Sequence, residues 1–176
     1  LHLSSAASDV YKRQTYNEVD LSSVIAIRKK YQDQFVKKHN TKLGFMSFFV
    51  KASVNSLQSF PHLNAELHQD ELIVKKYYDI GIAVATDEGL VVPVLRGADK
   101  LSSAEIELGI AELATKSREK KITLQELQGG TFSITNGGVF GSLMSTPLLN
   151  PPQVGILGMH KICLLYTSDA ADDKCS

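Results

Sequence analysis

The segment TFSITNGGVFGSLMSTPLLNPPQ, at residues 131–153, combines hydroxyl side chains with closely spaced glycines. Gly137, Gly138 and Gly141 would permit close approach of the backbone to a ligand. A hydroxyl at the end of a strand beside this glycine turn could donate a hydrogen bond to a developing oxyanion, and the segment supplies five: Ser133, Thr135, Ser142, Ser145 and Thr146. The pattern also fits an ordinary glycine turn with surface serines, and composition alone favours that alternative.

Other chemical signatures are missing from the sequence. It contains no GxSxG nucleophile elbow, no GxxxxGK[ST] phosphate loop and no HExxH zinc motif. A metal site is therefore not predicted, and a structural role is expected for the four histidines of the middle: His39, His62, His68 and His160. Two cysteines, Cys163 and Cys175, are too few for a disulfide framework or a four-cysteine zinc site.

Composition limits the class of protein. The chain has 176 residues, with 19 Lys plus Arg and 19 Asp plus Glu, so its formal net charge is zero. This balance argues against a dedicated nucleic-acid binder, which usually carries a basic excess. The 43% of hydrophobic residues suits one folded domain. No apolar run approaches the roughly 18–20 residues of a membrane span, so neither nucleic acid nor membrane is a predicted partner.

The two ends of the chain differ from its middle. Residues 1–14 and 163–176 lack helical or strand periodicity over a useful length. They resemble translated adapter or vector sequence, so we expect non-native tails there, with natural loose tails as the alternative. The predicted domain is residues 15–162, and the cysteines carry no functional meaning because both lie in a tail.

Two segments have the apolar spacing and the end signals of amphipathic helices. Apolar residues recur every three or four positions over residues 21–35, behind Asp20 as a possible N-cap, and Arg28 is expected in solvent. Residues 102–120 form the clearest helix, since Ser102 and Glu105 have the spacing of a capping box. A short helical turn at 123–127 starts in the same way.

A third helix is predicted between these two. Ser47 is a possible cap, and Phe60-Pro61 should end the helix near Ser59, because a residue before proline is disfavoured in the helical conformation. The expected buried face is Phe45, Phe48, Phe49, Ala52 and Leu57.

The remaining apolar runs predict strands. They lie at residues 15–20, 80–86, 90–95, 131–135 and 154–162, and a hairpin pairs 64–68 with 71–75. IGIAVAT and LVVPVL are nearly continuously apolar, which is typical of strands covered on both faces, and Pro93 suggests an edge or a bulge. The order of helices and largely antiparallel-capable strands favours a two-layer α/β domain.

Three phrases in the middle resemble the catalytic domain of the dihydrolipoamide acyltransferases, the E2 core components of the 2-oxo acid dehydrogenase complexes. They are LGFMSFFVKA at 43–52, GLVVPVLR at 89–96 and FSITNGGVFGSLMSTPLLNPPQVGILGMHKI at 132–162. NGGVFGSLMSTP resembles the succinyl-transferring branch, which serves the 2-oxoglutarate dehydrogenase complex. The resemblance implies an α/β two-layer sandwich with a mixed sheet, similar to chloramphenicol acetyltransferase. It also implies trimers, generally built into a larger core, with the active site between subunits.

The resemblance further implies a reaction and its participants. An acyl group moves from the dihydrolipoyl arm to the thiol of coenzyme A, which is a substrate. The lipoyl group is carried on a separate domain, so no cofactor is expected within this one. The implied partners are other E2 subunits, and the E1 and E3 components through domains that this sequence does not contain. The implied location is bacterial cytoplasm, or the mitochondrial matrix in a eukaryote.

Individual residues follow from the same resemblance. Thr135 matches the family hydroxyl that stabilises the tetrahedral oxyanion, so it is the expected catalytic residue. Asn136, Gly137 and Gly138 form the turn that presents it and are assigned to substrate binding, in a packing role more than a chemical one.

The family's general base is a histidine in a D-H-R-x-x-D-G motif, which this sequence lacks, and His160 lies in the wrong context to replace it. A thiol with a pKa of about 8.5 is mostly protonated at neutral pH and needs such a base. We therefore expect this chain to be a truncated domain that is inactive by itself. Two alternatives stay open: an acetyl or branched-chain acyltransferase, and a catalytically dead core scaffold.

Overall fold

A four-stranded mixed sheet forms the centre of the protein. The computed structural model describes residues 13–68 and 71–163. The sheet contains β3 (Ile80–Ile82), β6 (Val94–Leu95), β7 (Phe132–Asn136) and β8 (Ile156–Met159), in the order β6-β3-β7-β8. β6 pairs with β3 in antiparallel fashion, whereas β3–β7 and β7–β8 are parallel. The mixed sheet is as predicted, but the expectation of largely antiparallel strands is wrong at its centre.

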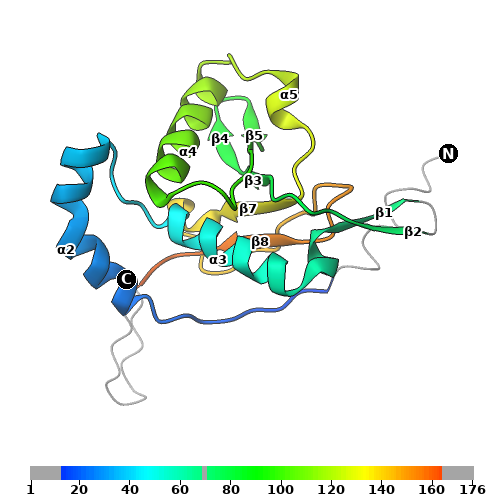
Figure 1. Cartoon of the computed structure of the whole chain (residues 1–176), viewed down its shortest axis with the longest axis horizontal. Coiled ribbons are helices and arrows are strands. Elements are labelled where there is room, and N and C mark those ends of the chain that lie inside the picture. The colour runs from blue at the N-terminus through cyan, green and yellow to red at the C-terminus, as the bar shows by residue number, and fades with distance from the viewer. Residues whose placement is uncertain (1–12, 69–70, 164–176) are drawn as a thin grey trace.

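Two helices pack against one face of this sheet (Figure 1). They are α3 (Met46–Ser59) and α4 (Ser103–Arg118). Their apolar side chains meet those of the strands in one core: Val50, Val54, Leu57, Ile80, Ile82, Leu95, Ala98, Ile106, Leu113, Ile134 and Met159. The capping box at the start of α4 is confirmed, because Ser102 and Glu105 each bond the other's backbone N–H.

The predicted buried face of α3 is right in part: Leu57 is buried in the core and Phe49 packs against it, whereas Phe45 and Phe48 are half-buried. Ser47 does not cap the helix but lies inside it, fully buried, and its N–H donates to Glu107 of α4 over 3.0 Å. Ser53 is buried as well, whereas Ala52 is exposed. Small side chains let two helices approach closely, as at Ser47 beside Glu107 of α4, and the phenylalanines stay half-buried. The predicted end of the helix at Phe60 is confirmed.

Each of the two long predicted strands is divided into two. β3 is followed by β4 (Val84–Thr86), and β5 (Gly89–Val91) precedes β6, with β4 and β5 forming a separate antiparallel pair. Pro93 lies at the division and has no N–H to donate, although its carbonyl accepts from Ile82 over 2.8 Å. β3 and β6 are buried as predicted, whereas Leu90 of β5 is 61% exposed, because β4 and β5 lie outside the central sheet.

Helix α2 (Ser22–His39) stands at one side of the molecule (Figure 1). It ends at Asn40 in the left-handed conformation, with φ at 53°. Asp20 accepts from the N–H of Ser22 over 2.8 Å, although the residue at the cap position is Leu21. The expectation that Arg28 lies in solvent is wrong. Its guanidinium donates to the carbonyl of Leu43 and stacks 3.9 Å from the centre of the Phe45 ring.

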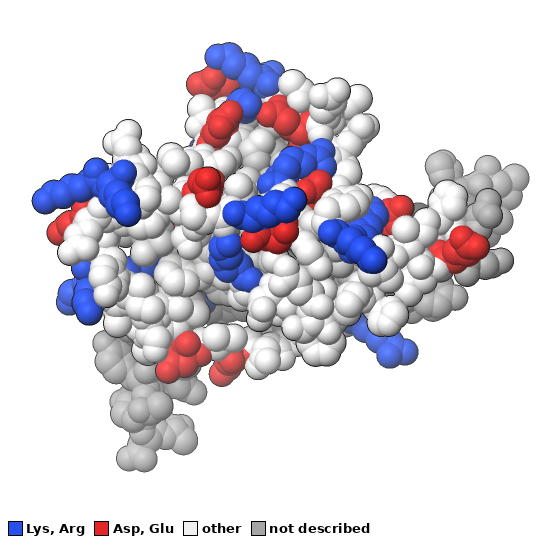
Figure 2. All heavy atoms as spheres, viewed as in Figure 1, with Lys and Arg blue, Asp and Glu red and all other residues white. Residues whose placement is uncertain are grey.

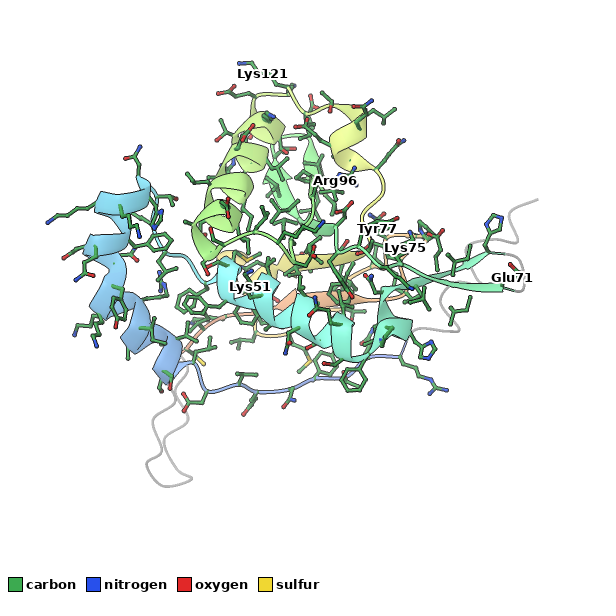
Figure 3. The ribbon with its side chains drawn as sticks, in the orientation of Figure 1. Lys51, Glu71, Lys75, Tyr77, Arg96 and Lys121 are labelled. Carbon is green, nitrogen blue, oxygen red and sulfur yellow. The ribbon has the colours of Figure 1, made fainter. Side chains whose placement is uncertain are left out.

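A hairpin of β1 (Ala65–His68) and β2 (Glu71–Val74) extends from the opposite end, as predicted. It follows a short 3₁₀ helix, η1 (Pro61–Asn64). At its base, Lys75 pairs with Glu66 over 2.5 Å and lies beside Tyr77, as Figure 3 shows. On the face seen in Figure 2, basic and acidic side chains are interspersed, in keeping with the balanced composition.

The N-terminal part of the described chain is not a strand, contrary to prediction. Residues 13–20 are exposed and pair with no strand in the part of the chain that the structure describes. The predicted tails fall largely on residues 1–12 and 164–176, outside the described residues, so they stay a prediction. No helix within 13–68 and 71–163 is long and apolar enough to cross a membrane.

Candidate active site

Strand β7 separates core side chains from those of the candidate site. Ile134 is fully buried in the core between sheet and helices. Since side chains alternate along a strand, Ser133 and Thr135 point to the opposite face. Thr135 is half-buried, and its hydroxyl makes no hydrogen bond with any other residue among 13–68 and 71–163. The strand therefore presents an unpaired hydroxyl at its carboxyl end.

The turn after Thr135 depends on one of its two glycines. It is a 3₁₀ helix, η2 (Gly137–Phe140), and the Asn136 side chain accepts from the N–H of Gly138 over 3.0 Å. A Cβ on Gly138 would lie 2.4 Å from the carbonyl oxygen of His160, whereas one on Gly137 would meet nothing closer than 3.5 Å. Gly138 is therefore required by close backbone approach and Gly137 is not.

The loop of residues 141–153, here called the site loop, lies over the end of β8 beside Thr135. In the sheet register Thr135 faces Gly158 of β8. A Cβ on Gly158 would lie 2.7 Å from Cγ of Pro147 and 3.7 Å from Cε1 of His160. Pro147 and the His160 ring therefore occupy the surface next to the Thr135 hydroxyl.

A histidine holds the middle of the site loop. The N–H of Ser145 donates to Nε2 of His160 over 2.8 Å, and the Ser145 hydroxyl lies 2.9 Å from the same nitrogen. Because a backbone N–H can only donate, Nε2 is the acceptor in its contact with the Ser145 N–H. Sequence reasoning left His160 without a role beside the site. Gly158 and His160 lie two residues apart in the strand predicted at 154–162, and this spacing could have placed both on the Thr135 face, although β8 itself ends at Met159.

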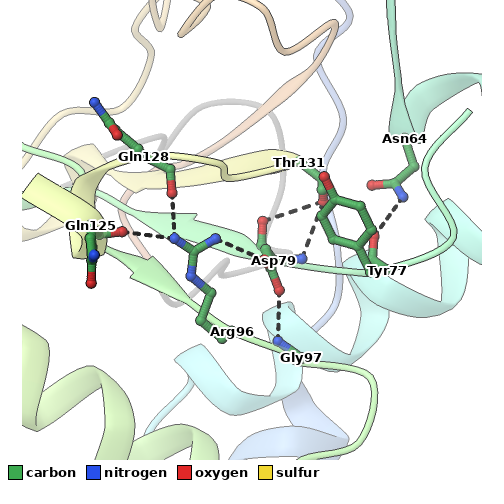
Figure 4. A network of polar contacts seen from close by, with 8 residues as sticks. All are labelled: Asn64, Tyr77, Asp79, Arg96, Gly97, Gln125, Gln128 and Thr131. Carbon is green, nitrogen blue, oxygen red and sulfur yellow. Dashed lines mark hydrogen bonds and ion pairs between the residues drawn. The ribbon is translucent and has the colours of Figure 1, made fainter. Parts of the chain in front are cut away.

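The opposite end of β7 carries a closed polar network (Figure 4). Arg96 donates to the Asp79 carboxylate over 2.8 Å and to the carbonyls of Gln125 and Gln128. The other Asp79 carboxylate oxygen accepts from the N–H of Gly97, and Thr131 bonds the Asp79 backbone. This network joins the starts of β3 and β7 to the helical turn α5 (Leu124–Leu127).

A hollow of about 820 Å³ lies near this network and away from Thr135. Lys116, one of its lining residues, bonds both Glu112 and Glu126, which raises the Lys116 pKa. The same lysine, together with Thr123, lowers the pKa of Glu126 to about 2. The charges of Lys116 and Glu126 in the hollow are thus paired within the protein. None of the predicted site residues lines the hollow.

The predicted site residues are gathered at one place. Thr135, Asn136, Gly137 and Gly138 are consecutive at the end of β7, whereas His39, His62 and His68 lie in α2, η1 and β1. No group of three His, Cys, Asp or Glu side chains within the described ranges could hold a metal ion. The arrangement offers a hydrogen-bond donor for an oxyanion, and Nε2 of the neighbouring His160 is already bonded to Ser145.

Sequence comparisons identify relatives over most of the chain. The family described as 2-oxoacid dehydrogenases acyltransferase (catalytic domain) matches residues 2–171. The chain is 67% identical over 150 residues to the dihydrolipoyllysine-residue succinyltransferase component of the 2-oxoglutarate dehydrogenase complex of Bacillus subtilis (strain 168). That match covers 85% of this chain and 36% of the relative. The Rickettsia typhi protein of the same name is 60% identical over 147 residues, covering 84% and 37%.

Solved structures agree with this result. Dihydrolipoamide acetyltransferase of Azotobacter vinelandii, studied for the roles of a serine, a histidine and an asparagine in its catalytic mechanism, matches with a TM-score of 0.81 at 36% identity. That match covers 85% of this chain and 62% of the other. The cubic core of the pyruvate dehydrogenase multienzyme complex also matches with a TM-score of 0.81 at 36% identity, covering 86% and 63%. The chain spans little more than a third of its curated relatives.

Proposed function

The chain belongs to the 2-oxoacid dehydrogenase acyltransferase family, and from this membership we propose that it is the acyl-transferring part of a dihydrolipoyllysine-residue succinyltransferase. The single observation that carries a catalytic role is the hydroxyl of Thr135 at the carboxyl end of β7, which has no partner among residues 13–68 and 71–163. A serine, a histidine and an asparagine are named in the catalytic mechanism of the Azotobacter vinelandii relative. The Thr135 hydroxyl is proposed to supply the equivalent hydrogen-bond donor here.

In the proposed reaction, the sulfur of coenzyme A attacks the carbonyl carbon of a succinyl thioester on the dihydrolipoyl group. A C–S bond to coenzyme A forms, and the C–S bond to the dihydrolipoyl sulfur breaks. The proton passes from the attacking thiol to a base and then to the departing sulfur. Negative charge develops on the carbonyl oxygen in between, and the Thr135 hydroxyl donates a hydrogen bond to that oxygen. Asn136, Gly137 and Gly138 hold Thr135 at the strand end for this contact.

We propose that the base is not one of the side chains beside Thr135. Nε2 of His160 already accepts from Ser145, so this nitrogen is not open to a thiol in the observed conformation. We assign the base to the histidine of a D-H-R-x-x-D-G motif, which the 176 residues do not contain. The chain alone should accordingly give no turnover in a coenzyme A acyl-transfer assay, and clear turnover would remove the need for that histidine.

The proposal extends to assembly. Exposed apolar side chains lie along α2, where Ile25, Ile27 and Tyr31 are each more than 40% exposed. Leu72 and Ile73 of the hairpin are similarly exposed. Such surfaces favour contact with other subunits, and one structural relative is the cubic core of a multienzyme complex. We propose an oligomeric E2 assembly built from trimers, with E1 and E3 as partners of the whole enzyme. The bacterial relatives support a bacterial cytoplasmic location.

A graft tests the function directly. Residues 15–162 would replace the matching segment of the Bacillus subtilis succinyltransferase component, to which this chain is 67% identical. The graft should transfer succinyl between coenzyme A and dihydrolipoamide, and should prefer succinyl to acetyl and branched acyl groups. A preference for acetyl would favour the alternative acyltransferase. An assembled graft without any transfer would favour a catalytically dead scaffold, with the unaltered Bacillus subtilis protein as the reference.

A further inference from the structure

A buried polar pair lies beneath the site loop. The hydroxyl of Ser133 donates to Oε1 of Gln153 over 2.6 Å, and the two residues are 1% and 8% exposed. A Cβ on Gly81 would lie 2.8 Å from the Ser133 hydroxyl oxygen, and one on Gly130 would lie 2.9 Å from Nε2 of Gln153. The pair therefore occupies space that two glycines leave open.

The pair joins the strand of the candidate site to the end of the site loop. Ser133 lies two residues before Thr135 and points to the same face of β7. Gln153 is the last residue of the loop, and its N–H donates to the carbonyl of Asn150 over 3.0 Å. β8 then begins at Ile156, which faces Ser133 in the register. The loop that places Pro147 beside Thr135 is thus closed on the same strand that carries Thr135.

From this geometry we infer that Gln153 is a positioning residue for acyl transfer, fixing the site loop over the Thr135 face of β7 through the Ser133 hydroxyl. The inference rests on the proposed function of Thr135. A buried hydroxyl without an acceptor costs free energy, so the bond to Gln153 favours the closed loop over conformations in which Ser133 is left unpaired. Small displacements of groups beside a reacting carbonyl lower the rate steeply.

The first test measures how firmly the site loop is held, and it does not depend on enzyme activity. Amide hydrogen exchange in the 176-residue chain would compare the wild type with Gln153→Met, which keeps the length of the side chain but removes its acceptor. We expect about tenfold faster exchange at Ser142 and Ser145, whose N–H groups hold the loop, and no change at Ile106 in α4. Gln58→Met, at an exposed glutamine of α3, is the matched control. Unchanged loop exchange in Gln153→Met would overturn the inference.

The second test measures the reaction in the graft. Gln153→Met should lower kcat about ten- to a hundredfold while KM for coenzyme A stays within about twofold. Gln153→Glu keeps an acceptor for Ser133 and should restore most of the rate. The double variant Ser133→Ala with Gln153→Met should have the same kcat as Gln153→Met alone. Each substitution removes the same Ser133–Gln153 hydrogen bond, so the second has nothing further to break.

The outcomes separate this inference from the proposed function. If Gln153→Met speeds loop exchange but leaves kcat unchanged, the loop is fixed by Gln153 without consequence for the chemistry, and the positioning role is wrong. If Thr135→Ala leaves kcat unchanged while Gln153→Met lowers it, the role assigned to Thr135 fails instead. A fall in kcat that Gln153→Glu does not restore would also contradict a role through the Ser133 bond.

Discussion

The two ends of β7 treat their polar groups in opposite ways. At the amino end, the N–H of Thr131 donates to the carbonyl of Asp79. The Arg96 guanidinium donates to the Asp79 carboxylate and to the carbonyls of Gln125 and Gln128 (Figure 4). At the carboxyl end, the Thr135 hydroxyl has no partner among the described residues. The Thr135 hydroxyl is half-buried and so stays accessible to a ligand, whereas the polar groups at the amino end are occupied by one another.

This contrast separates a structural role at the amino end of β7 from the proposed catalytic role at its carboxyl end. The amino end joins β3, β7 and the helical turn α5, and so fixes the register in which Ile80 faces Phe132. That register carries forward to Thr135, because β7 lies between two parallel neighbours. A fixed strand can present a donor in one position, and preorganisation of this kind is what makes an oxyanion contact effective. Changes at the two ends should therefore have different signatures.

The largest expected effect is on rate, at the open end. Thr135→Ala in the graft should lower kcat about 10²- to 10³-fold, or about 2.7–4 kcal/mol, because one oxyanion donor is lost. KM should change little, since the contact forms mainly in the transition state. Thr135→Ser keeps a hydroxyl and should retain most of the rate. Steady-state kinetics check this. A Thr135→Ala enzyme with normal kcat would end the oxyanion assignment.

The same variant should leave stability intact, because the Thr135 hydroxyl bonds nothing among the described residues. Urea unfolding of the 176-residue chain should give a free energy within about 0.5 kcal/mol of the wild type. A large loss would mean that the open end is a structural contact, and the contrast between the two ends would disappear.

The next effect is on stability, at the closed end. Asp79→Ala removes the acceptor of both Arg96 and the Gly97 N–H, and should lower the free energy of unfolding by about 3 kcal/mol. Lys120→Ala breaks an ion pair with Glu88 in which both side chains are exposed, and should cost less than about 0.5 kcal/mol. Urea unfolding compares the two. Equal small losses would show that the network is not what holds the strand.

Sequence reasoning succeeded where a local pattern decides the structure. The capping boxes at Ser102 and Thr123, the hairpin and the position of Thr135 on a strand are each set by neighbouring residues, and all are confirmed. The family resemblance drawn from three phrases is confirmed as well. In each case the signal lies within a few residues of the feature that it predicts.

Features that depend on distant partners were missed. Ser47 of α3 is buried where its N–H meets Glu107 of α4, and the Arg28 guanidinium stacks on the Phe45 ring. The anchoring of Ser145 by His160 joins residues fifteen apart through a loop without periodicity. The spacing of residue types along the chain does not predict contacts between such distant residues. The catalytic role of Thr135 stays a prediction, because only a reaction tests it.

A smaller effect separates the two glycines of the turn. Gly138→Ala should destabilise the chain by about 2 kcal/mol, because the new Cβ would press on the His160 carbonyl, which is backbone and cannot move aside freely. Gly137→Ala should cost less than about 0.5 kcal/mol, since its Cβ would make only ordinary contacts. Thermal unfolding checks both. Similar losses for the two would contradict the close approach of the turn to the end of β8.

The smallest expected effect concerns how α5 supports the closed end. The pKa of Glu126 is lowered from 4.5 to about 2, first by its bond with Lys116 and then by the bonds from Thr123. A depressed pKa means that the carboxylate stabilises the fold above about pH 4.5, and that this contribution is lost as the pH falls towards 2. Glu126→Gln should therefore lower the unfolding midpoint at pH 6, with the difference from the wild type shrinking between pH 4.5 and 2.

Glu119→Gln is the control, because Glu119 pairs with Lys121 on the surface, and it should give a smaller difference at pH 6. Gln125 of α5 and Gln128, just after it, supply carbonyls to Arg96, so a pH-independent difference would show that Glu126 acts there through packing and not through its charge.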